Sequence, residues 1–248
     1  LLYVGISGDG DSLSIGIGHL VHAIRRNVQL MYIIENNGVY GLTKGQFSAS
    51  ADVGSKAKKG KPNQFSPIDP MMVGMAIGAT FLARSFSGDK EQLVPIRKAA
   101  AAHRGLALID VISPCVTFND HEGSTKSYLF TREHELKATV TDFIAPAPEI
   151  VAAVPNDGVR RIAMHGGNVL NFRSVPDGYD PTDRTTVSAY LQERHAEGEI
   201  VTGLLYVDES TDDMHELNNT SVTPLAQLPY SQLTPGAAEL ARMQDSFR

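Results

Sequence analysis

Cysteine, tryptophan and long apolar stretches are scarce or missing in this chain of 248 residues, which has one cysteine and no tryptophan. One cysteine excludes an internal disulfide framework, so a reducing cytoplasm is the expected compartment. No apolar stretch approaches the roughly 20 residues of a membrane-spanning helix, so no membrane partner is expected. Positive charge is also limited, because 22 Lys and Arg face 28 Asp and Glu for a net charge of −6. Nucleic-acid-binding domains are basic, so no nucleic-acid partner is expected either.

What remains is the composition of an ordinary globular protein, with 42% hydrophobic and 20% charged residues. The length suits one large α/β domain, or one such domain with a small appendage. The chain starts at Leu1, without a Met and inside an apolar run that has the pattern of a core strand. We therefore interpret it as a fragment that lacks its N-terminal segment.

Apolar runs alternate with stretches of helical periodicity, which is typical of a doubly wound, mostly parallel α/β sheet. The composition changes after about residue 124, and we expect a division into residues 1–138 and 139–248. A Pro-rich linker is expected at 145–148, and the tail at 217–235 is expected to wrap a surface. The long polar segment 38–67 is expected to be functional, because structureless loops of that length are uncommon in compact domains. Strands are predicted at 1–7 (buried), 29–34, 80–84, 106–112 and 200–207, and helices at 12–27, 70–78 and 90–103.

The most informative motif is Gly8-Asp9-Gly10-Asp11, which follows the first predicted strand. Asn37 stands 28 positions after Asp9 (37 − 9), directly after the second predicted strand. Strand, helix and strand bring both side chains to the carboxyl edge of the sheet, where ligands bind in such folds. Carboxylate and amide oxygens suit Mg²⁺, which shares its remaining positions with water and phosphate. Gly8 and Gly10 allow a sharp turn and a close approach to phosphate oxygens. The alternative is a plain turn, which the Asn-Asn-Gly element at the matching strand end disfavours.

These residues resemble the thiamine diphosphate motif. The resemblance implies that Asp9, the Asn37 side chain and the Val39 carbonyl bind Mg²⁺, which then holds the diphosphate. Residues 8–11, 19–27, 35–46 and 112–119 together resemble the β subunit of 2-oxoacid:ferredoxin oxidoreductases of the 2-oxoglutarate type. The similarity is strong over residues 1–130 and looser beyond them.

This resemblance implies CoA-dependent oxidative decarboxylation of a 2-oxoacid to acyl-CoA and CO₂. Electrons then pass through a [4Fe-4S] cluster to ferredoxin, and the reaction can also run in reverse. Residues 1–138 are expected to bind thiamine diphosphate and Mg²⁺, and residues 139–248 to form a C-terminal extension that contacts other subunits. The partner α subunit is expected to supply the pyrimidine-binding domain with its activating glutamate, so no catalytic base is expected in this chain.

The resemblance also assigns residues around the cofactor. Gly8, Gly10 and Gly41 are expected to contact it, and Leu42 to lie between it and the 2-oxoacid. Lys44 is expected to pair with a distal carboxylate, which favours 2-oxoglutarate over pyruvate; the alternative is a solvated loop cation. Asp11 is expected to contact the cofactor, or else to cap the helix that begins near Ser12.

Cys115 stands in a Ser-Pro-Cys context that resembles the position of the fourth cluster ligand in that family. A [4Fe-4S] cluster typically takes four thiolates, so the other three ligands are expected upstream of Leu1. The alternative is a small buried apolar residue. The lysines of 56–61 form a solvated face, or else they attract CoA phosphates or an acidic ferredoxin.

Four alternative functions account for part of this pattern. The first is a pyruvate-specific member of the same family. The second is a non-oxidative thiamine decarboxylase or acetolactate synthase, which carries both cofactor domains on one longer chain and has no use for Cys115. The third is a noncatalytic ligand-binding α/β module, which does not explain Asn37 or the block 41–46. The fourth is a hydrolase with Asp9 and Asp11 as paired carboxylates, although neighbours two apart in a turn rarely face each other across a substrate.

Overall fold

The computed structural model describes residues 2–56, 61–145 and 159–247. The lysines at 58 and 59 and most of the predicted linker at 145–148 lie outside these ranges. The chain divides into two compact units, Leu1–Met214 and His215–Arg248. In the described part of the chain, no helix has the length and apolar character needed to cross a bilayer.

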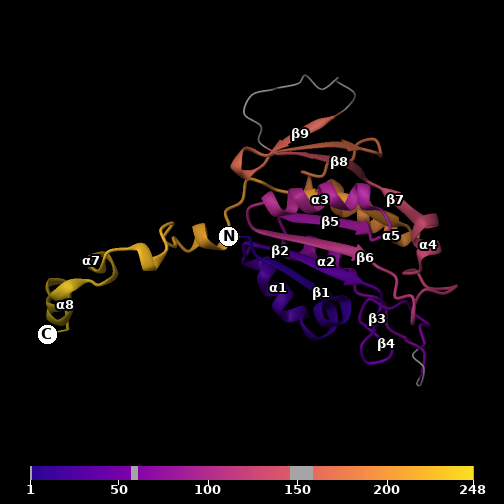
Figure 1. The fold of residues 1–248 in the computed structure, drawn as a ribbon, viewed down its shortest axis with the longest axis horizontal. Helices are drawn as coiled ribbons and strands as arrows, with labels where there is room; N and C mark the ends of the chain where they lie inside the picture. The colour runs from indigo at the N-terminus through magenta and orange to yellow at the C-terminus, as the bar shows by residue number, and fades with distance from the viewer. Residues whose placement is uncertain (1, 57–60, 146–158, 248) are drawn as a thin grey trace. The chain divides into compact units, whose positions relative to one another are not determined.

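The first unit contains a six-stranded sheet in the order β1-β2-β6-β5-β11-β7 (Figure 1). Strands β1, β2, β6 and β5 are mutually parallel, β11 is antiparallel to β5, and β7 is parallel to β11. The predicted doubly wound, mostly parallel sheet is therefore confirmed. The six strands are β1 Val4–Gly8, β2 Leu30–Asn36, β5 Phe81–Phe86, β6 Leu106–Ile112, β7 Glu135–Lys137 and β11 Ile200–Val207.

Two smaller sheets, five α-helices, a π-helix (Gly10–Ile15) and a 3₁₀-helix (His165–Gly167) complete the described part of this unit. The single helix predicted at 12–27 is therefore wrong, because the π-helix ends before α1 begins. The hairpin β3–β4 lies in the long polar segment, and β8, β10 and β9 form an antiparallel sheet. Their bounds are β3 Val39–Tyr40, β4 Gln46–Phe47, β8 Thr139–Ile144, β9 Arg160–Ala163 and β10 Val169–Ser174. The helices are α1 Ile17–Arg25, α2 Pro70–Ile77, α3 Lys90–Ala102, α4 Tyr128–His134 and α5 Arg184–Ala196.

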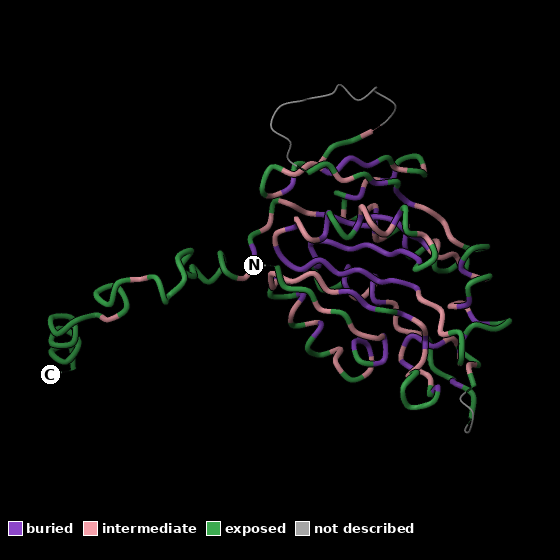
Figure 2. The backbone as a smooth tube through the Cα atoms, viewed as in Figure 1, coloured by how far each residue is buried: buried purple, intermediate pink, exposed green. Residues whose placement is uncertain are grey.

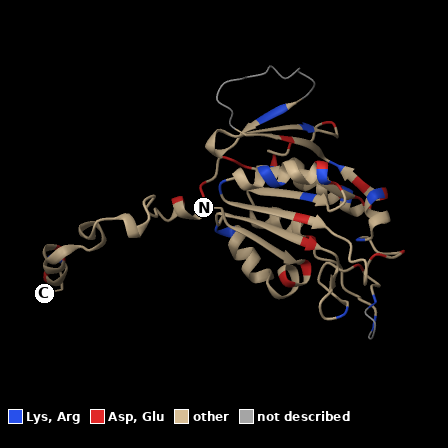
Figure 3. Cartoon of the chain, in the orientation of Figure 1, with Lys and Arg blue, Asp and Glu red and all other residues tan. Residues whose placement is uncertain are grey.

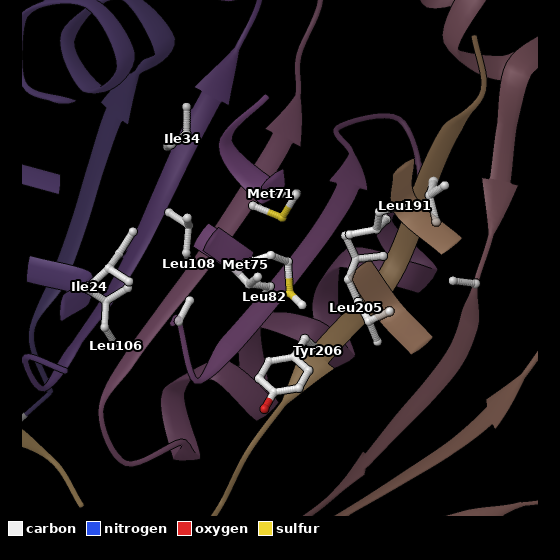
Figure 4. Packing of buried hydrophobic residues seen from close by; sticks show 14 of the residues in the cluster. Ile24, Ile34, Met71, Met75, Leu82, Leu106, Leu108, Leu191, Leu205 and Tyr206 are labelled. Atoms are coloured by element: carbon white, nitrogen blue, oxygen red, sulfur yellow. The ribbon is translucent and has the colours of Figure 1, made fainter. Parts of the chain in front are cut away.

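The central strands are buried on both faces, as Figure 2 shows. All seven residues of β6 are buried, and those from Leu106 to Ile109 alternate between two apolar clusters. Leu106 and Leu108 pack with residues of α1, α2 and α5, part of which Figure 4 shows. Ala107 and Ile109 pack on the other face with residues of α3 and the small antiparallel sheet. The near-continuous apolar pattern of β6 follows from this double burial.

Local signals set the ends of α2 where the sequence predicts them. The Asp69 carboxylate accepts the amide of Met71 at 2.7 Å, and Pro70 occupies the first turn, where its missing N–H costs nothing. Gly78 ends the helix with a φ of 95°, a left-handed conformation that glycine adopts without strain. The helix thereby delivers the chain to β5.

The prediction that the first strand is buried is wrong, although the strand itself is confirmed. β1 is the edge strand of the sheet and has β2 as its neighbour. Tyr3, Val4 and Ile6 are 56%, 46% and 63% exposed. An apolar run shows that a segment suits a strand, but it does not show how many sides of that strand are covered.

The strand predicted at residues 200–207 is confirmed as β11, and it pairs with β5 inside the central sheet. The division expected after residue 138 stays a prediction. The second unit, taken by itself, contains the short helix α7 (Tyr230–Leu233) and the longer α8 (Gly236–Asp245), and α6 (Met214–Leu217) lies at the boundary. The expected wrapping of residues 217–235 over a surface also stays a prediction.

Candidate functional site

The carboxyl ends of β1 and β2 bring Asp9 and Asn37 together, as their spacing predicts. Asp9 is fully buried. The main-chain amides of Asn37 and Gly38 donate to the Asp9 carboxylate at 3.2 and 3.1 Å. The loop that begins after β2 is thus folded around the carboxylate that follows β1.

Two serines complete the surroundings of Asp9, and sequence reasoning missed both. The hydroxyl of Ser48 donates to Asp9 Oδ2, and the hydroxyl of Ser50 lies 2.6 Å from the same oxygen. Both serines belong to the polar segment after β4. The length of that segment indicated a function, but a Ser-x-Ser pair in a loop has no distinctive pattern.

A pocket of about 630 Å³ opens beside this carboxylate at the edge of the sheet. A methyl group on Gly8 or Gly41 would meet no atom within 4 Å, so the missing side chains leave pocket space. At Gly10 a methyl group would instead lie 2.4 Å from the Tyr40 ring. The pocket brings together most of the predicted cofactor residues; its lining is Gly8, Gly10, Asp11, Ile15, Asn37, Val39, Tyr40, Gly41, Leu42, Thr43 and Gln46.

The donor set beside the pocket suits Mg²⁺ in its chemistry. The side-chain oxygen of Asn37 accepts the amide of Val39 at 3.1 Å, which fixes the turn that carries both predicted ligands. Asp9 Oδ1 accepts one hydrogen bond, from the Asn37 amide, and a carboxylate oxygen has a second lone pair for a cation. An all-oxygen set with few protein ligands is typical of Mg²⁺ that also binds phosphate. Groups of three or more His, Cys, Asp or Glu able to hold a metal do not occur among the described residues.

The predicted substrate residues lie on the turn between β3 and β4. Leu42 lines the pocket and is 96% exposed. Lys44 is exposed and has a φ of 84°, and it is not among the lining residues. Asp11 also lines the pocket, and its carboxylate accepts the Ser7 hydroxyl at 3.4 Å. Contacts from these side chains to cofactor or substrate stay predictions.

The loop after β6 carries Cys115 and packs on the Asn37 loop. The Cys115 carbonyl accepts the Asn119 amide at 2.8 Å, and the Asn119 side chain donates to the Asn37 carbonyl at 2.8 Å. Asn119 is buried and was not predicted to have a role. The half-buried Cys115 provides one thiolate, so this chain alone does not fit a four-thiolate cluster. Its role as the fourth cluster ligand stays a prediction.

Behind the site lies a buried charge network that gave no signal in the sequence. Arg84 on β5 donates to Asp110 on β6 at 2.7 Å and to Asp69 at 2.6 Å. Burial raises the pKa of Asp110 and outweighs the attraction of Arg84. Burial also acts to raise the pKa of Asp69, but Arg84 and the amides of α2 outweigh it and lower that pKa. Figure 3 shows charged residues interrupting the central strands of this unit.

Part of the chain that carries this pocket is similar in sequence to known proteins. Residues 2–111 match the family described as "Thiamine pyrophosphate enzyme, C-terminal TPP binding domain". The chain is 50% identical over 130 residues to the 2-oxoacid:ferredoxin oxidoreductase subunit beta of Saccharolobus solfataricus, covering 52% of this chain and 42% of that protein. It is 41% identical over 164 residues to the subunit of the same name from a Sulfolobus species, covering 65% of this chain and 52% of that protein. It is also 41% identical over 116 residues to the 2-oxoglutarate oxidoreductase subunit KorB of Mycobacterium tuberculosis, covering 46% and 31%.

The matched segments thus span about half or less of these curated relatives. A solved structure of 2-oxoglutarate:ferredoxin oxidoreductase from Magnetococcus marinus, with 2-oxoglutarate, coenzyme A and succinyl-CoA bound, superposes with a TM-score of 0.63 at 24% identity. That alignment covers 92% of this chain and 66% of the other. At this identity the likeness establishes the fold, and it extends the common architecture to most of the chain.

Proposed function

We propose, from the similarity of the first half of this chain to 2-oxoacid:ferredoxin oxidoreductase β subunits, that the chain holds the diphosphate end of thiamine diphosphate in such an enzyme. The proposed reaction converts a 2-oxoacid and CoA to acyl-CoA and CO₂, with ferredoxin as electron acceptor. The observation that carries the proposal is the pocket at the sheet edge. It gathers Gly8, Gly10, Asn37, Val39 and Gly41 next to the buried Asp9.

In the proposed site, Asp9, the Asn37 side chain and the Val39 carbonyl hold Mg²⁺. The open positions at Gly8 and Gly41 leave room for the diphosphate against the main chain. Bound thiamine diphosphate supplies the electron sink for decarboxylation. The chain's own residues bind and orient that group, and no side chain among them is assigned as the catalytic base.

The remaining groups of the proposed enzyme are divided between a partner subunit and this chain. We assign the activating glutamate to a partner α subunit, and we assign Cys115 as one of the thiolates on the route of electrons to ferredoxin. The geometry carries no step through a cluster, because one thiolate alone does not build it. A cytoplasmic location is part of the proposal.

For the substrate we propose 2-oxoglutarate. The relatives from Mycobacterium tuberculosis and Methanocaldococcus jannaschii are named for 2-oxoglutarate, at 41% and 37% identity. A cation on the β3–β4 turn offers a partner for the second carboxylate of that acid, which pyruvate lacks. Lys44 occupies this position, exposed and three residues after Gly41 (44 − 41).

The test is low-potential dye reduction by the complex purified anaerobically through this chain, with 2-oxoglutarate or pyruvate and with or without CoA. CoA-dependent reduction with 2-oxoglutarate is expected. Reduction with pyruvate alone would keep the enzyme class and reject the substrate. If the complex releases CO₂ in the absence of CoA and reduces no dye, the chain would be reassigned to the non-oxidative thiamine enzymes.

A matched pair of variants ties the activity to the pocket. Asp9→Asn removes the charge of the buried carboxylate, and Asp177→Asn removes the same charge at an exposed position outside the pocket. Loss of dye reduction is expected in the first and full activity in the second. Melting curves of both proteins would show whether a loss reflects folding instead.

A further inference from the structure

A continuous line of buried polar side chains runs from Arg84 to Asp9, and we call it the buried relay. Arg84 Nε donates to Asp110 Oδ2 at 2.7 Å, and the Asn36 amide nitrogen donates to Asp110 Oδ1 at 3.0 Å. The oxygen of Asn36 lies 2.8 Å from the Ser50 hydroxyl, which lies 2.6 Å from Asp9 Oδ2. Neighbouring strands hold the first three members, since Arg84 is paired with Asp110 in the sheet register and Asn36 lies on the other side of β6.

The relay is costly in a sheet interior. Asp9 and Asp110 are 0% exposed, Ser50 is 1% and Asn36 is 3% exposed. Apolar residues of similar volume often stabilise a core as well as, or better than, a buried ion pair. The positions next to Asp110 on β6 are apolar, so the strand itself does not require a charge there. Networks of hydrogen-bonded side chains in a core favour one arrangement of their members.

Arg84 determines which atoms donate and which accept along the buried relay. Arg84 only donates, so Asp110 receives its bond as an acceptor. The Asn36 amide must then present its NH₂ group to Asp110 and its oxygen to Ser50, which is how the orientation of an amide is assigned from its partners. The hydroxyl of Ser50 has one proton and faces two acceptors, the Asn36 oxygen and Asp9 Oδ2. The Ser50 hydroxyl, which also lies 3.2 Å from the Ser48 hydroxyl, thus connects the Asn36 side chain to the Asp9 carboxylate.

We propose that Arg84, Asp110, Asn36 and Ser50 are positioning residues that orient the Asp9 carboxylate for Mg²⁺. This inference rests on the proposed function, because it assigns the cation to Asp9. Groups that hydrogen-bond a metal ligand fix its orientation, and their removal typically lowers metal affinity by about 10- to 100-fold. The relay extends that outer layer from Ser50 to the ion pair.

A second cavity makes the proposal testable. It has a volume of about 150 Å³, and Arg84, Asp110, Asn36 and Ser50 are all among its lining residues. Polar cavities of this size hold water, which can replace a lost side-chain partner without collapse of the core. Arg84 keeps Asp69 as a second partner at 2.6 Å when Asp110 is changed. Variants of the relay are therefore expected to fold.

The experiment measures binding and does not depend on turnover. The complex purified through this chain is stripped with a chelator, and thiamine diphosphate retention is measured by equilibrium dialysis over a Mg²⁺ series. The variants are Ser50→Ala, Asp110→Asn and the double variant. The matched control is Ser85→Ala, since Ser85 is also buried and donates at 2.7 Å to the neutral oxygen of Gln92, away from the relay. Melting temperatures are recorded for all proteins without Mg²⁺.

Ser50→Ala and Asp110→Asn are each expected to raise the Mg²⁺ concentration for half-saturation by about 10-fold, with Ser85→Ala unchanged. In the Ser50→Ala background, Asp110→Asn is expected to add less than about 2-fold, because the path to Asp9 is already cut. Unchanged Mg²⁺ dependence in both single variants, with normal wild-type binding, would overturn the relay and leave the proposed function standing. Fully additive effects would also overturn it. Wild-type protein that needs no Mg²⁺ to bind the cofactor would overturn the proposed function and the relay together.

Discussion

Replacing Gly10 by alanine should destabilise the first unit through one contact. The new methyl group would lie 2.4 Å from Tyr40 Cε1, and the ring cannot simply step aside because its hydroxyl donates to the Gly10 carbonyl at 2.9 Å. Overpacking costs about 1–3 kcal/mol, and the lost hydrogen bond adds about 0.5–1.5 kcal/mol. The substitution also stabilises the folded state by about 0.5–1 kcal/mol, because glycine loses more conformational freedom on folding than alanine does. The net destabilisation is about 2 kcal/mol, which lowers the melting temperature by about 4–8 °C for a unit of this size.

Gly8→Ala is the matched control, because a methyl group there meets no atom within 4 Å and points into pocket space. It should melt like wild type and bind thiamine diphosphate more weakly. Melting curves of Gly10→Ala, Tyr40→Ala and the double variant complete the assay. The double variant should recover most of the stability lost in Gly10→Ala, relative to Tyr40→Ala alone. Equal melting temperatures for Gly10→Ala and wild type, or strictly additive losses, would refute the assigned contact.

Three further predictions follow from the same structure. Lys44→Ala should raise KM for 2-oxoglutarate by about 10-fold, because one charge-assisted hydrogen bond is lost. KM for any pyruvate turnover should stay unchanged. Equal shifts in both KM values would mean that Lys44 is a solvated cation. Cys115→Ser should abolish dye reduction in the anaerobic complex while Mg²⁺-dependent cofactor binding persists, and retained electron transfer would exclude the thiolate role. Asp89→Ala should cost about 1 kcal/mol at pH 7 in denaturant unfolding, because the Asp89 carboxylate caps α3 through the Gln92 amide and pairs with Lys137 at 2.5 Å. Burial acts to raise the pKa of Asp89, but Lys137 and that amide lower it overall, so the unfolded chain binds the proton more tightly and this contribution disappears as pH falls below about 4.

The main strands and helices up to Ile112, and β11, could be predicted because their causes are local, whereas α4, α5, the β3–β4 hairpin and β7 to β10 were not predicted. The apolar run of β6, the cap before α2 and the glycine after it each act within a few residues. The same holds for the meeting of Asp9 and Asn37, since a strand, a helix and a parallel strand return the chain to the same edge. Where the prediction concerned coverage by distant segments, as for the exposed face of β1, it was wrong.

The residues around Asp9 could not be predicted for a related reason. Ser48 and Ser50 reach the carboxylate because the β3–β4 hairpin turns the chain back, and a hairpin with strands of two residues has almost no periodicity to detect. Asp110 stands in the middle of an apolar strand, where its charge is explained only by Arg84 on the next strand. Asn119 reaches Asn37 across 82 positions (119 − 37). These contacts depend on the hairpin and on the order of strands in the sheet, which the sequence pattern leaves open.

The position of the site at the edge of the sheet has a consequence for how it is held together. Among the described strands β1 has one neighbour, so pairing alone constrains the end of that strand less than it constrains the ends of β2 or β6. Asp9 follows β1, yet it is fully buried and receives its hydrogen bonds from the amides of Asn37 and Gly38 and from Ser48 and Ser50. These donors all come from the segment after β2. The carboxylate and the loop therefore order each other, and a cation bound at Asp9 would stabilise both.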